Sequence, residues 1–600
     1  MRICKIEIKN FKSIRHVEMH CGPVTALLGP NNHGKSNVLQ ALDFFLNPGN
    51  KVRESDFCFH RSEGDDLLWV EVTFCELSPD EEKKFARYLF KGQVRIRKTA
   101  LLEQRPRGNK VQIAYYGWLS EPQEAWLKAG YAAEVKKATL HPELAPYLPK
   151  VRFSKAAVAE AQQAYIDAHR DEIQYSFALE GGPFLGSRTV PAGIFPDAFM
   201  IPAVRDLTDE TKTKATSLFG RLLNRTIGEM AEADAAFQSL RDGLIELVRR
   251  LNRAEDGNDE RPTQLRSLET RLEGELSDWD VKLDIRISPP EIEKVFELGT
   301  SLHVYDGVAT PAEEKGHGLQ RALIFALTRA WAGALRRQAE ANATASSSVT
   351  LLVEEPELYL HPHAQRLLNR NLRAIAKAEH HQVILCTHSP QFVDITRERD
   401  IVMIHKPSPQ QGTCVRQSNV DLFTGDDNAS RKQRFNLGHW INPERAELFF
   451  ARRVIFVEGA TERVLLPYLA ERLDIYDTEV SIIDCGSKFS LPIYMELAGA
   501  FGLDHMVIHD EDPVPEGLEG NRLRQALRTF ELNDEILALA EQTGSIVRRI
   551  SPDFEGATGI SKAKGHRMNK PLAALDHFHG LALEDIPPTL REIIEEVYAP

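Results

Sequence analysis

The segment GPNNHGKS, residues 29–36, constrains the fold of this 600-residue chain more than any other feature. It fits the pattern G-x-x-x-x-G-K-[ST]. It lies between PVTALLGP, which predicts a short buried strand, and KSNVLQALDFFL, whose apolar residues recur at helical spacing. In a strand, glycine-rich loop and helix of this order, backbone N–H groups and the helix N-terminus both face an anion. We therefore predict a phosphate-binding loop at residues 29–36.

The side chains of this loop have expected roles in nucleotide binding. Lys35 is expected to neutralise charge on the β- and γ-phosphates, and Ser36 is expected to hold Mg²⁺. The full set of predicted nucleotide contacts in the loop is Gly29, Asn31, Asn32, Gly34, Lys35 and Ser36.

A second part of the nucleotide site is predicted in VTLLVEEPELYLHP, residues 349–362, where a buried strand ends in two acids. In ATPases with a phosphate-binding loop, acids at this place hold the Mg²⁺ shell and position the attacking water. We assign Glu354 to the metal and Glu355 to the activation of water. His388, in VILCTHSP, follows another predicted strand and is expected to sense the γ-phosphate.

A separate acidic site is predicted around VIFVEGATERVLLPYLAERL, residues 454–473. Glu458 ends a buried strand, and Glu462 lies on the first turn of the following helix, so both carboxylates can face one point. In HMVIHDEDP, a later strand ends in Asp510 and Asp512, and alternate residues of a strand share a face. Converging carboxylates repel one another unless a divalent cation lies between them, and oxygen ligands suit Mg²⁺ or Mn²⁺. The sequence therefore predicts a metal site here.

Residues 313–330, EEKGHGLQRALIFALTRA, place Gly316 and Gly318 at the start of a long predicted helix, whose N-terminus favours anions. With its order of phosphate-binding loop, insertion, this segment, acidic strand and histidine, the chain resembles ABC-type ATPases of the SMC/RecF-like branch. In that class the signature segment of one protomer closes on the nucleotide of another. The resemblance therefore implies a dimer of ATPase heads, although KGHGLQ lacks the serine of the commoner S-G-G-Q form.

The C-terminal part is similar to a Toprim domain, which has a glutamate after its first strand and D-x-D after a later one. An SMC/RecF-like ATPase followed by a Toprim domain resembles the OLD (overcoming lysogenization defect) family of nucleases, over nearly the whole chain. That resemblance implies DNA cleavage with two metal ions. The implied ligands of the first ion are Glu458, Glu462 and Asp510, and those of the second are Asp510, Asp512 and Glu555, with Asp553 close by.

The family resemblance also implies a lysine that stabilises the charged transition state of cleavage. The candidates are Lys570, Lys562 and Lys564, and their spacing does not choose between them.

These motifs together predict an α/β protein. It consists of an ABC-type ATPase head with a β-rich lobe and a helical dimerisation insertion, followed by a C-terminal Toprim α/β domain. Strands are expected from 67 to 118 and again in VKLDIRIS, 281–288. The predicted parts are the ATPase N-terminal part at 1–204, the helical insertion at 205–282, the ATPase C-terminal part at 283–430 and the Toprim domain at 445–600.

Composition sets further limits. The chain has no run of 18 apolar residues, so no membrane contact is expected. Its seven cysteines are scattered without a C-x-x-C pair, which argues against a disulfide framework and fits a cytoplasmic location. A formal charge of −13 argues against a generally basic coat, but a local groove of Lys and Arg is sufficient for DNA.

We interpret the chain as an ATP-binding and ATP-hydrolysing DNA endonuclease or nickase whose ATPase regulates the Toprim site. The expected cofactors are ATP and Mg²⁺ or Mn²⁺, with two ions at the Toprim site and one at the nucleotide. The family resemblance adds bacterial defence against phage. The expected partners are DNA and a second copy of the chain, bound through the heads and the insertion. A higher oligomer and a second defence component, protein or nucleic acid, are further candidates.

Two other functions were weighed against this interpretation. One is an ATP-gated DNA-binding clamp or scaffold with a non-catalytic Toprim domain, and the paired carboxylates argue against it. The other is a topoisomerase or primase. It ranks last, because the roughly 45 residues after Glu555 are too few for a strand-passage domain.

Overall fold

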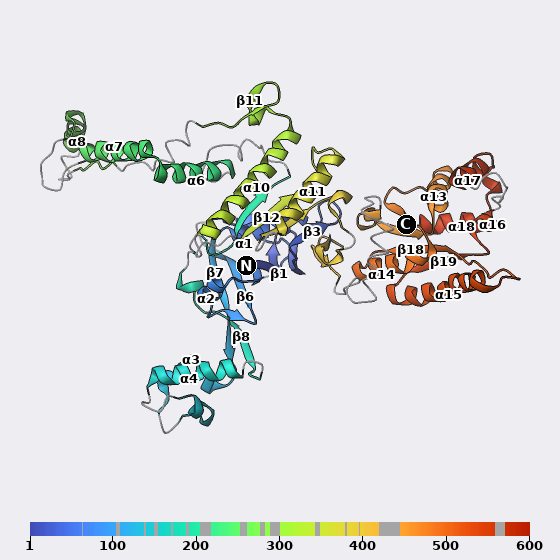
Figure 1. Ribbon diagram of the computed structural model, residues 1–600, viewed down its shortest axis with the longest axis horizontal. Coiled ribbons are helices and arrows are strands. Elements are labelled where there is room, and N and C mark those ends of the chain that lie inside the picture. The colour runs from blue at the N-terminus through green and yellow to red at the C-terminus, as the bar shows by residue number, and fades with distance from the viewer. Residues whose placement is uncertain are drawn as a thin grey trace. The chain divides into compact units, whose positions relative to one another are not determined.

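The computed structural model describes the chain in two compact units, Met1–Ala203 with Ser348–Pro600, and Val204–Ser347 (Figure 1). Within them, the residues that are not described are 63, 104–108, 137–139, 149–153, 170–171, 188–189, 191–192, 204–217, 253–260, 276–282, 288–299, 342–347, 378–380, 395–396, 419–444, 559–569 and 600.

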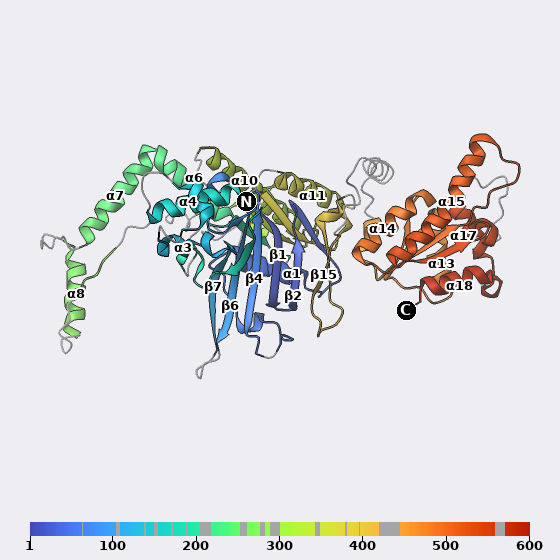
Figure 2. The same cartoon turned by 90° about the horizontal axis from the view of Figure 1, so that it is seen from below.

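An antiparallel sheet of seven strands forms the predicted β-rich lobe (Figure 2). Its order is β2-β1-β4-β6-β7-β8, with β5 beside β6. Apolar and polar residues alternate along β1, so one face of the sheet enters the core and the other meets solvent. The strands are β1 Arg2–Phe11, β2 Ile14–His20, β4 Leu67–Cys75, β5 Leu89–Phe90, β6 Gln93–Glu103, β7 Lys110–Pro122 and β8 Tyr175–Leu179.

A second sheet of six strands carries the nucleotide motifs, in the order β15-β14-β3-β13-β12-β9. All its pairs are parallel except β14–β15 at the edge. Every residue of β3 and β13 is buried, as expected for strands covered on both faces. The strands are β3 Val24–Leu28, β9 Asp197–Ile201, β12 Val349–Glu354, β13 His381–Cys386, β14 Ile401–His405 and β15 Cys414–Arg416.

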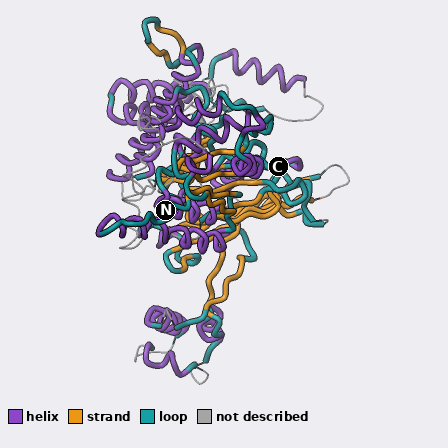
Figure 3. The backbone as a smooth tube through the Cα atoms, turned by 90° about the vertical axis from the view of Figure 1, so that its right-hand side faces the viewer, coloured by secondary structure: helices purple, strands orange, loops and turns teal. Residues whose placement is uncertain are grey.

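Helix α1, Lys35–Leu46, packs between the two sheets, and its apolar side chains join both to one core. Two other helices flank these sheets, α2 Pro79–Lys84 and α11 Pro362–Ala376. Strands β7 and β8 continue as a two-stranded ribbon that carries α3, Ala129–Glu134, and α4, Lys155–Ala168 (Figure 3). These helices have a small core of their own around Leu144 and Val158.

The unit Val204–Ser347 is mainly helical in its described residues and extends beyond the insertion predicted at 205–282. It contains α6 Leu218–Ala233, α7 Ala235–Leu251, α8 Thr263–Glu275, β10 His303–Tyr305, β11 Ala309–Pro311 and α10 His317–Ala341.

The strand expected at 281–288 is wrong for its described part, 283–287, which forms no strand. This segment donates alternate backbone N–H groups to side chains rather than to a neighbouring strand. Ile285 N donates to Glu269 Oε1 and Ile287 N to Asn252 Oδ1, at 2.8 and 2.7 Å. The alternating pattern therefore reports an extended backbone but not a sheet.

The C-terminal part forms a parallel sheet of four strands, β17-β16-β18-β19, with helices on both faces. On β16, Ile455 and Val457 belong to the core with α13, while the ring of Phe456 lies 5.5 Å from that of Tyr494 on α14. The elements are β16 Arg453–Val457, α13 Ala460–Arg472, β17 Val480–Asp484, α14 Leu491–Phe501, β18 His505–Asp510, α15 Gly520–Thr543, β19 Ile546–Ile550, α16 Phe554–Thr558, α17 Lys570–His579 and α18 Pro588–Val597. Among the described residues, no helix is both long and apolar enough to span a membrane.

Candidate functional site

The phosphate-binding loop joins β3 to α1, as predicted, and its glycines are required by close backbone packing. Gly29 and Gly34 have φ of 140° and 105°. A Cβ atom on Gly29 would lie 1.9 Å from the carbonyl oxygen of Ile404, and one on Gly34 would lie 2.2 Å from Thr413 Oγ1. Any side chain at either position would therefore displace the neighbouring strand or loop.

Lys35 is buried at the start of α1 and holds the loop closed around its ammonium group. Its Nζ donates hydrogen bonds to the carbonyl oxygens of Gly29 and Pro30, both at 2.8 Å. Burial lowers the pKa of Lys35, and the nearby acids Glu355 and Glu357 oppose this shift. Of the other predicted loop contacts, Asn31 and Asn32 are exposed and Ser36 is half-buried.

The acidic strand and the histidine lie at the same edge of the sheet as the loop, because β12, β13 and β3 are parallel neighbours. Glu354 ends β12 and accepts a hydrogen bond from the backbone N–H of Ala203 at 3.2 Å. Glu355 has a left-handed backbone, φ 43°, and its N–H donates to Cys386 O at 2.9 Å. The buried Nε2 of His388 has no hydrogen-bond partner in the described part of the chain. Burial and Lys35 lower the pKa of His388.

Sequence reasoning missed Glu357, which joins the two loops at this edge. Its carboxylate accepts hydrogen bonds from Thr387 Oγ1 at 2.7 Å and from the backbone N–H of His388 at 2.6 Å. The third acid of EEPE was the available signal, but the pattern does not show which loop its side chain reaches.

The signature segment forms a helix start, as predicted. Gly316 precedes α10, which begins at His317, and Gly318 lies in its first turn. Gln320 Nε2 donates to the carbonyl oxygens of Glu313 and Lys315, at 2.8 and 2.6 Å, and so fixes the approach of the chain to this helix.

In the C-terminal sheet, three predicted acids meet at the carboxyl ends of β16 and β18. Glu458 follows β16, and its Oε1 accepts a hydrogen bond from the backbone N–H of Asp510 at 2.8 Å. Burial raises the pKa of Glu458 to about 7, that of Asp510 to about 7 and that of Glu462 to about 8. Asp510 and Glu555 add to the shift at Glu462, and Asp512 adds to the shift at Asp510. These carboxylates are therefore close enough to repel one another.

The strand argument for Asp510 and Asp512 is wrong in one respect. Strand β18 ends at Asp510, and Asp512 has a left-handed backbone with φ 51°, so the two do not share a strand face. A turn brings them together, because the N–H of Asp512 donates to Pro552 O at 3.0 Å.

The remaining predicted acids follow β19. Asp553 Oδ1 accepts from the N–H of Gly556 at 2.7 Å, and Glu555 lies in the first turn of α16. Lys570 Nζ lies 2.5 Å from Glu555 Oε1, although 66% of its side chain is exposed. Lys562 and Lys564 lie outside the described residues.

Sequence reasoning also missed Lys488, a buried lysine beside the acids, which is only 3% exposed. Its Nζ lies 3.2 Å from Asp512 Oδ2, and it also donates to the carbonyl oxygen of Asp510. It follows β17 in the glycine turn CGSKFS, a strand end at the same edge of the sheet. The position of Lys488 shortly after a predicted strand was the sequence signal that could have identified it.

The acidic side chains at this edge of the C-terminal sheet are of the chemical type that binds a hard divalent cation, because all their donor atoms are carboxylate oxygens. Within the described residues, however, no group of three or more His, Cys, Asp or Glu side chains is arranged to hold a metal ion. Several carboxylates are instead bonded to protein groups: Glu458 to the Asp510 N–H, Asp510 to the Phe554 N–H and Asp512 to Lys488.

Comparisons with known proteins match both the ATPase part and the Toprim part of the chain. Residues 1–172 and 194–393, more than half of the chain, match the family described as AAA ATPase domain. The chain belongs to this AAA ATPase family. Residues 449–512 match the family described as Overcoming lysogenization defect protein-like, TOPRIM domain. The predicted fold class, an ATPase head followed by a Toprim domain, is therefore confirmed.

Relatives that match along most of the chain are OLD nucleases. The OLD nuclease of Thermus scotoductus is 23% identical over 605 residues, which cover 99% of this chain and 98% of the relative. The Old nuclease of Escherichia phage P2 is 22% identical over 530 residues, 85% of this chain and 77% of the relative. These matches confirm the resemblance to the OLD family and the prediction of an enzyme with ATPase and nuclease domains. Such domains use a nucleotide and a divalent metal.

Solved structures of two kinds are also similar. An SMC head bound to the C-winged helix domain of ScpA is 13% identical with a TM-score of 0.33, and covers 72% of this chain and 100% of that chain. The C-terminal region of the Xanthomonas campestris pv. campestris OLD protein is 22% identical with a TM-score of 0.18, and covers 25% and 95%.

Proposed function

We propose that this AAA ATPase family member is a metal-dependent DNA endonuclease or nickase whose Toprim site is regulated by ATP. The observation that carries the proposal is the meeting of Glu458, Glu462 and Asp510 at one edge of the C-terminal sheet. Burial raises their pKa values to about 7, 8 and 7, and neighbouring carboxylates add to each shift, so the protein keeps acids together in a place where their charged forms are costly. A structural role alone gives no reason for such an arrangement.

As cofactors of this site we propose two Mg²⁺ or Mn²⁺ ions, because its donors are carboxylate oxygens. The ligands proposed for the first ion are Glu458, Glu462 and Asp510, and those for the second are Asp510, Asp512 and Glu555, with Asp553 close by. Bound ions of this kind activate water and shield the leaving oxygen of a phosphodiester.

The chain's own cations serve the Toprim site in different ways. Lys488 stabilises the turn that carries Asp510 and Asp512, because its buried ammonium bonds to both residues. Lys570 is exposed beside Glu555, where it can approach a phosphate of the DNA. Lys570, rather than Lys488, is therefore our choice for stabilising the charged transition state; the other candidates, Lys562 and Lys564, remain open.

At the nucleotide site, Lys35 neutralises phosphate charge, and Ser36 and Glu354 hold the Mg²⁺ that accompanies ATP. Glu355 orients the attacking water. The unpartnered Nε2 of His388 supports its proposed contact with the γ-phosphate, because a buried ring nitrogen without a partner costs free energy until a ligand meets it. A nucleotide that binds two conformations with different affinity then shifts the equilibrium that controls cleavage.

Helix α7 supports a homodimer through the insertion. Its apolar residues Phe237, Leu240, Leu244, Leu247 and Leu251 recur three and four positions apart and form one stripe. Leu240 and Leu247 are 45% and 52% exposed within a single chain. A second copy of the helix would cover this stripe, and Gly316 and Gly318 would then serve the nucleotide of the partner.

The family resemblance extends the proposal to bacterial defence against phage, with a second defence component, protein or nucleic acid, as a further partner. A relative named Endonuclease GajA, from Bacillus cereus, is 27% identical over 187 residues, 28% of this chain.

The experiment that tests the function is conversion of supercoiled plasmid to nicked and linear DNA with Mg²⁺ or Mn²⁺, with and without ATP. Cleavage that is lost in Asp510→Ala places the chemistry at the Toprim site, and Lys35→Ala shows the direction of control by ATP. If wild-type protein that hydrolyses ATP leaves the plasmid uncut under every condition, the nuclease proposal fails and the ATP-gated clamp takes its place.

A further inference from the structure

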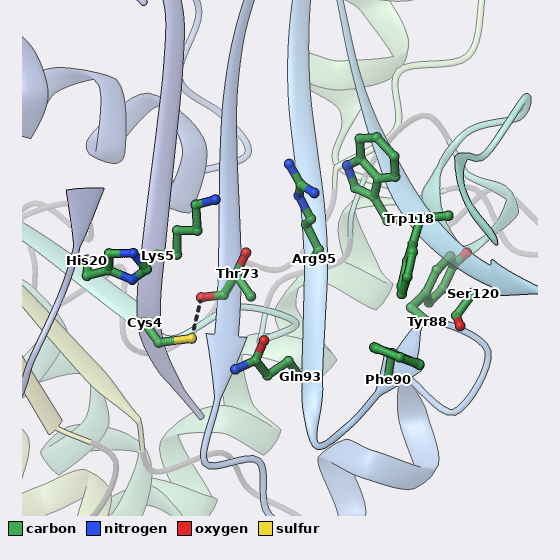
Figure 4. Close-up of a pocket in the computed structure, with 11 residues that line it drawn as sticks. Cys4, Lys5, His20, Thr73, Tyr88, Phe90, Gln93, Arg95, Trp118 and Ser120 are labelled. Carbon is green, nitrogen blue, oxygen red and sulfur yellow. Dashed lines mark hydrogen bonds between the residues drawn. The ribbon is translucent and has the colours of Figure 1, made fainter. Parts of the chain in front are cut away.

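The solvent-facing side of the antiparallel sheet carries a hollow of about 360 Å³ that neither proposed site uses. The register of the strands brings the side chains that line this hollow next to one another. Lys5 pairs with His20 on one side and with Thr73 on the other, and Thr73 pairs with Arg95. Paired residues of antiparallel strands share a face, so these side chains form one row across four strands. Figure 4 shows this row, with Arg95 between Lys5 and the ring of Trp118 on the next strand.

Aromatic rings close one end of the hollow. Trp118, Tyr88 and Phe90 gather there in Figure 4, and Phe177 of β8 also lines it. The rings of Phe90 and Phe177 are 4.7 Å apart and nearly perpendicular, at 83°. Phe177 nevertheless remains 49% exposed. An exposed ring on a sheet face offers a stacking surface, the device by which sheet-based modules bind unpaired bases.

The charges around the hollow are balanced. Lys5 pairs with Glu18 at 2.7 Å, and Arg95 binds Glu7 at 3.1 Å as well as the buried Glu71. The Arg95 guanidinium also lies 4.5 Å from the centre of the Trp118 ring. Each cation that lines the hollow thus has an acidic partner, so the hollow suits a planar polar ring better than a polyanion.

Polar groups that line the hollow beside the rings can meet the edge of such a ligand. The buried hydroxyl of Ser120 has no hydrogen-bond partner in the described part of the chain, and Gln93 presents an exposed amide on the same side. A heterocycle that stacks on Phe177 would give Ser120 the partner that the fold does not supply, and a buried hydroxyl gains free energy from such a bond. Apolar faces with polar edges are the chemistry of a nucleobase.

We propose that this hollow binds one unpaired nucleobase. The base stacks on the ring of Phe177 and meets the nearly perpendicular ring of Phe90 with its edge, and the hydroxyl of Ser120 and the amide of Gln93 contact its polar groups. It can come from a free nucleotide or from an unpaired position in DNA. In either case the β-rich lobe is a binding surface in its own right, apart from the phosphate-binding loop and the Toprim acids.

The test uses the full chain with Lys35→Ala, which removes the first nucleotide site, in EDTA, so that cleavage plays no part. Two probes are crosslinked by ultraviolet light, an oligothymidylate with one 5-iodouracil and 5-iodo-2′-deoxyuridine monophosphate. Crosslinked peptides are then mapped by mass spectrometry. We expect crosslinks in residues 88–95, 118–120 or 175–179. Phe177→Ala should lower their yield by at least about fivefold, the smaller effect expected for loss of one stacking ring.

Phe59→Ala is the matched control, because Phe59 is 87% exposed and does not line the hollow. It should leave the crosslink yield unchanged. Competition by unlabelled thymidine monophosphate would identify a free nucleotide as the source of the base, and competition by the oligonucleotide alone would identify DNA. Crosslinks of both probes only outside residues 88–95, 118–120 and 175–179, or equal yields at these residues in Phe177→Ala and wild type, would overturn the proposal. Plasmid cleavage that depends on Asp510 is measured separately, so the nucleobase proposal and the nuclease proposal can each fail without the other.

Discussion

At the residue scale, Lys488 is the side chain whose removal should disturb the Toprim site most, although Lys488 is not itself a proposed metal ligand. Lys488→Met removes the ammonium that bonds to Asp510 O and Asp512 Oδ2, so the Asp512 carboxylate loses its cationic partner, while Asp510 O keeps the hydrogen bond with His509 Nδ1. We expect a loss of about 1–3 kcal/mol in unfolding free energy, measured by denaturant titration, and at least a tenfold loss of plasmid cleavage.

Lys570→Met is the matched control for Lys488→Met, because the Lys570 side chain is 66% exposed and its ion pair with Glu555 is screened by solvent. Its unfolding free energy should stay within about 0.5 kcal/mol of wild type. Equal stability of wild type and Lys488→Met would show that the buried ammonium does not support the acidic turn.

The raised pKa values of the acids predict how pH changes stability when no metal is bound. A carboxyl whose folded pKa is about 7 binds more protons folded than unfolded between roughly pH 4 and 7, so folding stability falls as pH rises through that window. In EDTA, the melting temperature of wild type should fall between pH 5 and 8. Asp510→Asn should reduce that fall, because it removes one of the repelling charges. A steeper fall in Asp510→Asn would contradict the assigned repulsion.

At the element scale, Glu357 couples the ends of β12 and β13. Glu357→Ala frees Thr387 and the His388 backbone, so His388 is no longer held at the nucleotide. We expect kcat for ATP hydrolysis to fall at least tenfold, with a smaller change in KM, because Lys35 and the loop stay in place. Glu357→Gln keeps one acceptor oxygen, and its kcat for ATP hydrolysis should lie between those of wild type and Glu357→Ala. Steady-state ATPase kinetics would contradict this role if Glu357→Ala kept the wild-type kcat.

At the scale of the whole molecule, the exposed stripe of α7 predicts the oligomeric state. Leu240→Glu with Leu247→Glu places two charges on the surface that a partner helix would bury, and should convert a dimer into a monomer in light scattering. ATP hydrolysis should fall with it, because the proposed nucleotide site needs the signature segment of a second copy. Ser239→Glu, an exposed position off the stripe on the same helix, is the control and should stay dimeric. A double variant that remains dimeric would place the dimer contact elsewhere.

The sequence by itself determined the helices and strands, and it determined the strand ends and helix starts at which the proposed sites lie. The loop at 29–36, the strand that ends at Glu354, the start of α10 after Gly316 and the strands that end at Glu458 and Asp510 all follow from local patterns. Such patterns report backbone conformation and burial, which neighbours in the chain largely decide. Parallel strands then bring their carboxyl ends to one edge, so the meeting of the acids was predictable as well.

Only the tertiary structure decided which side chains meet across distant segments. Lys488 reaches the acidic turn, Glu357 bridges two loops, and Phe177 lies at one end of a hollow whose row of side chains starts on β2. The left-handed turn at Asp512 and the side-chain partners of 283–287 were likewise hidden from the sequence. Each depends on strand register and on how loops pack against each other, and these arise from contacts between residues that are tens of positions apart, such as the 24 between Lys488 and Asp512 and the 30 between Glu357 and Thr387, which no local spacing encodes.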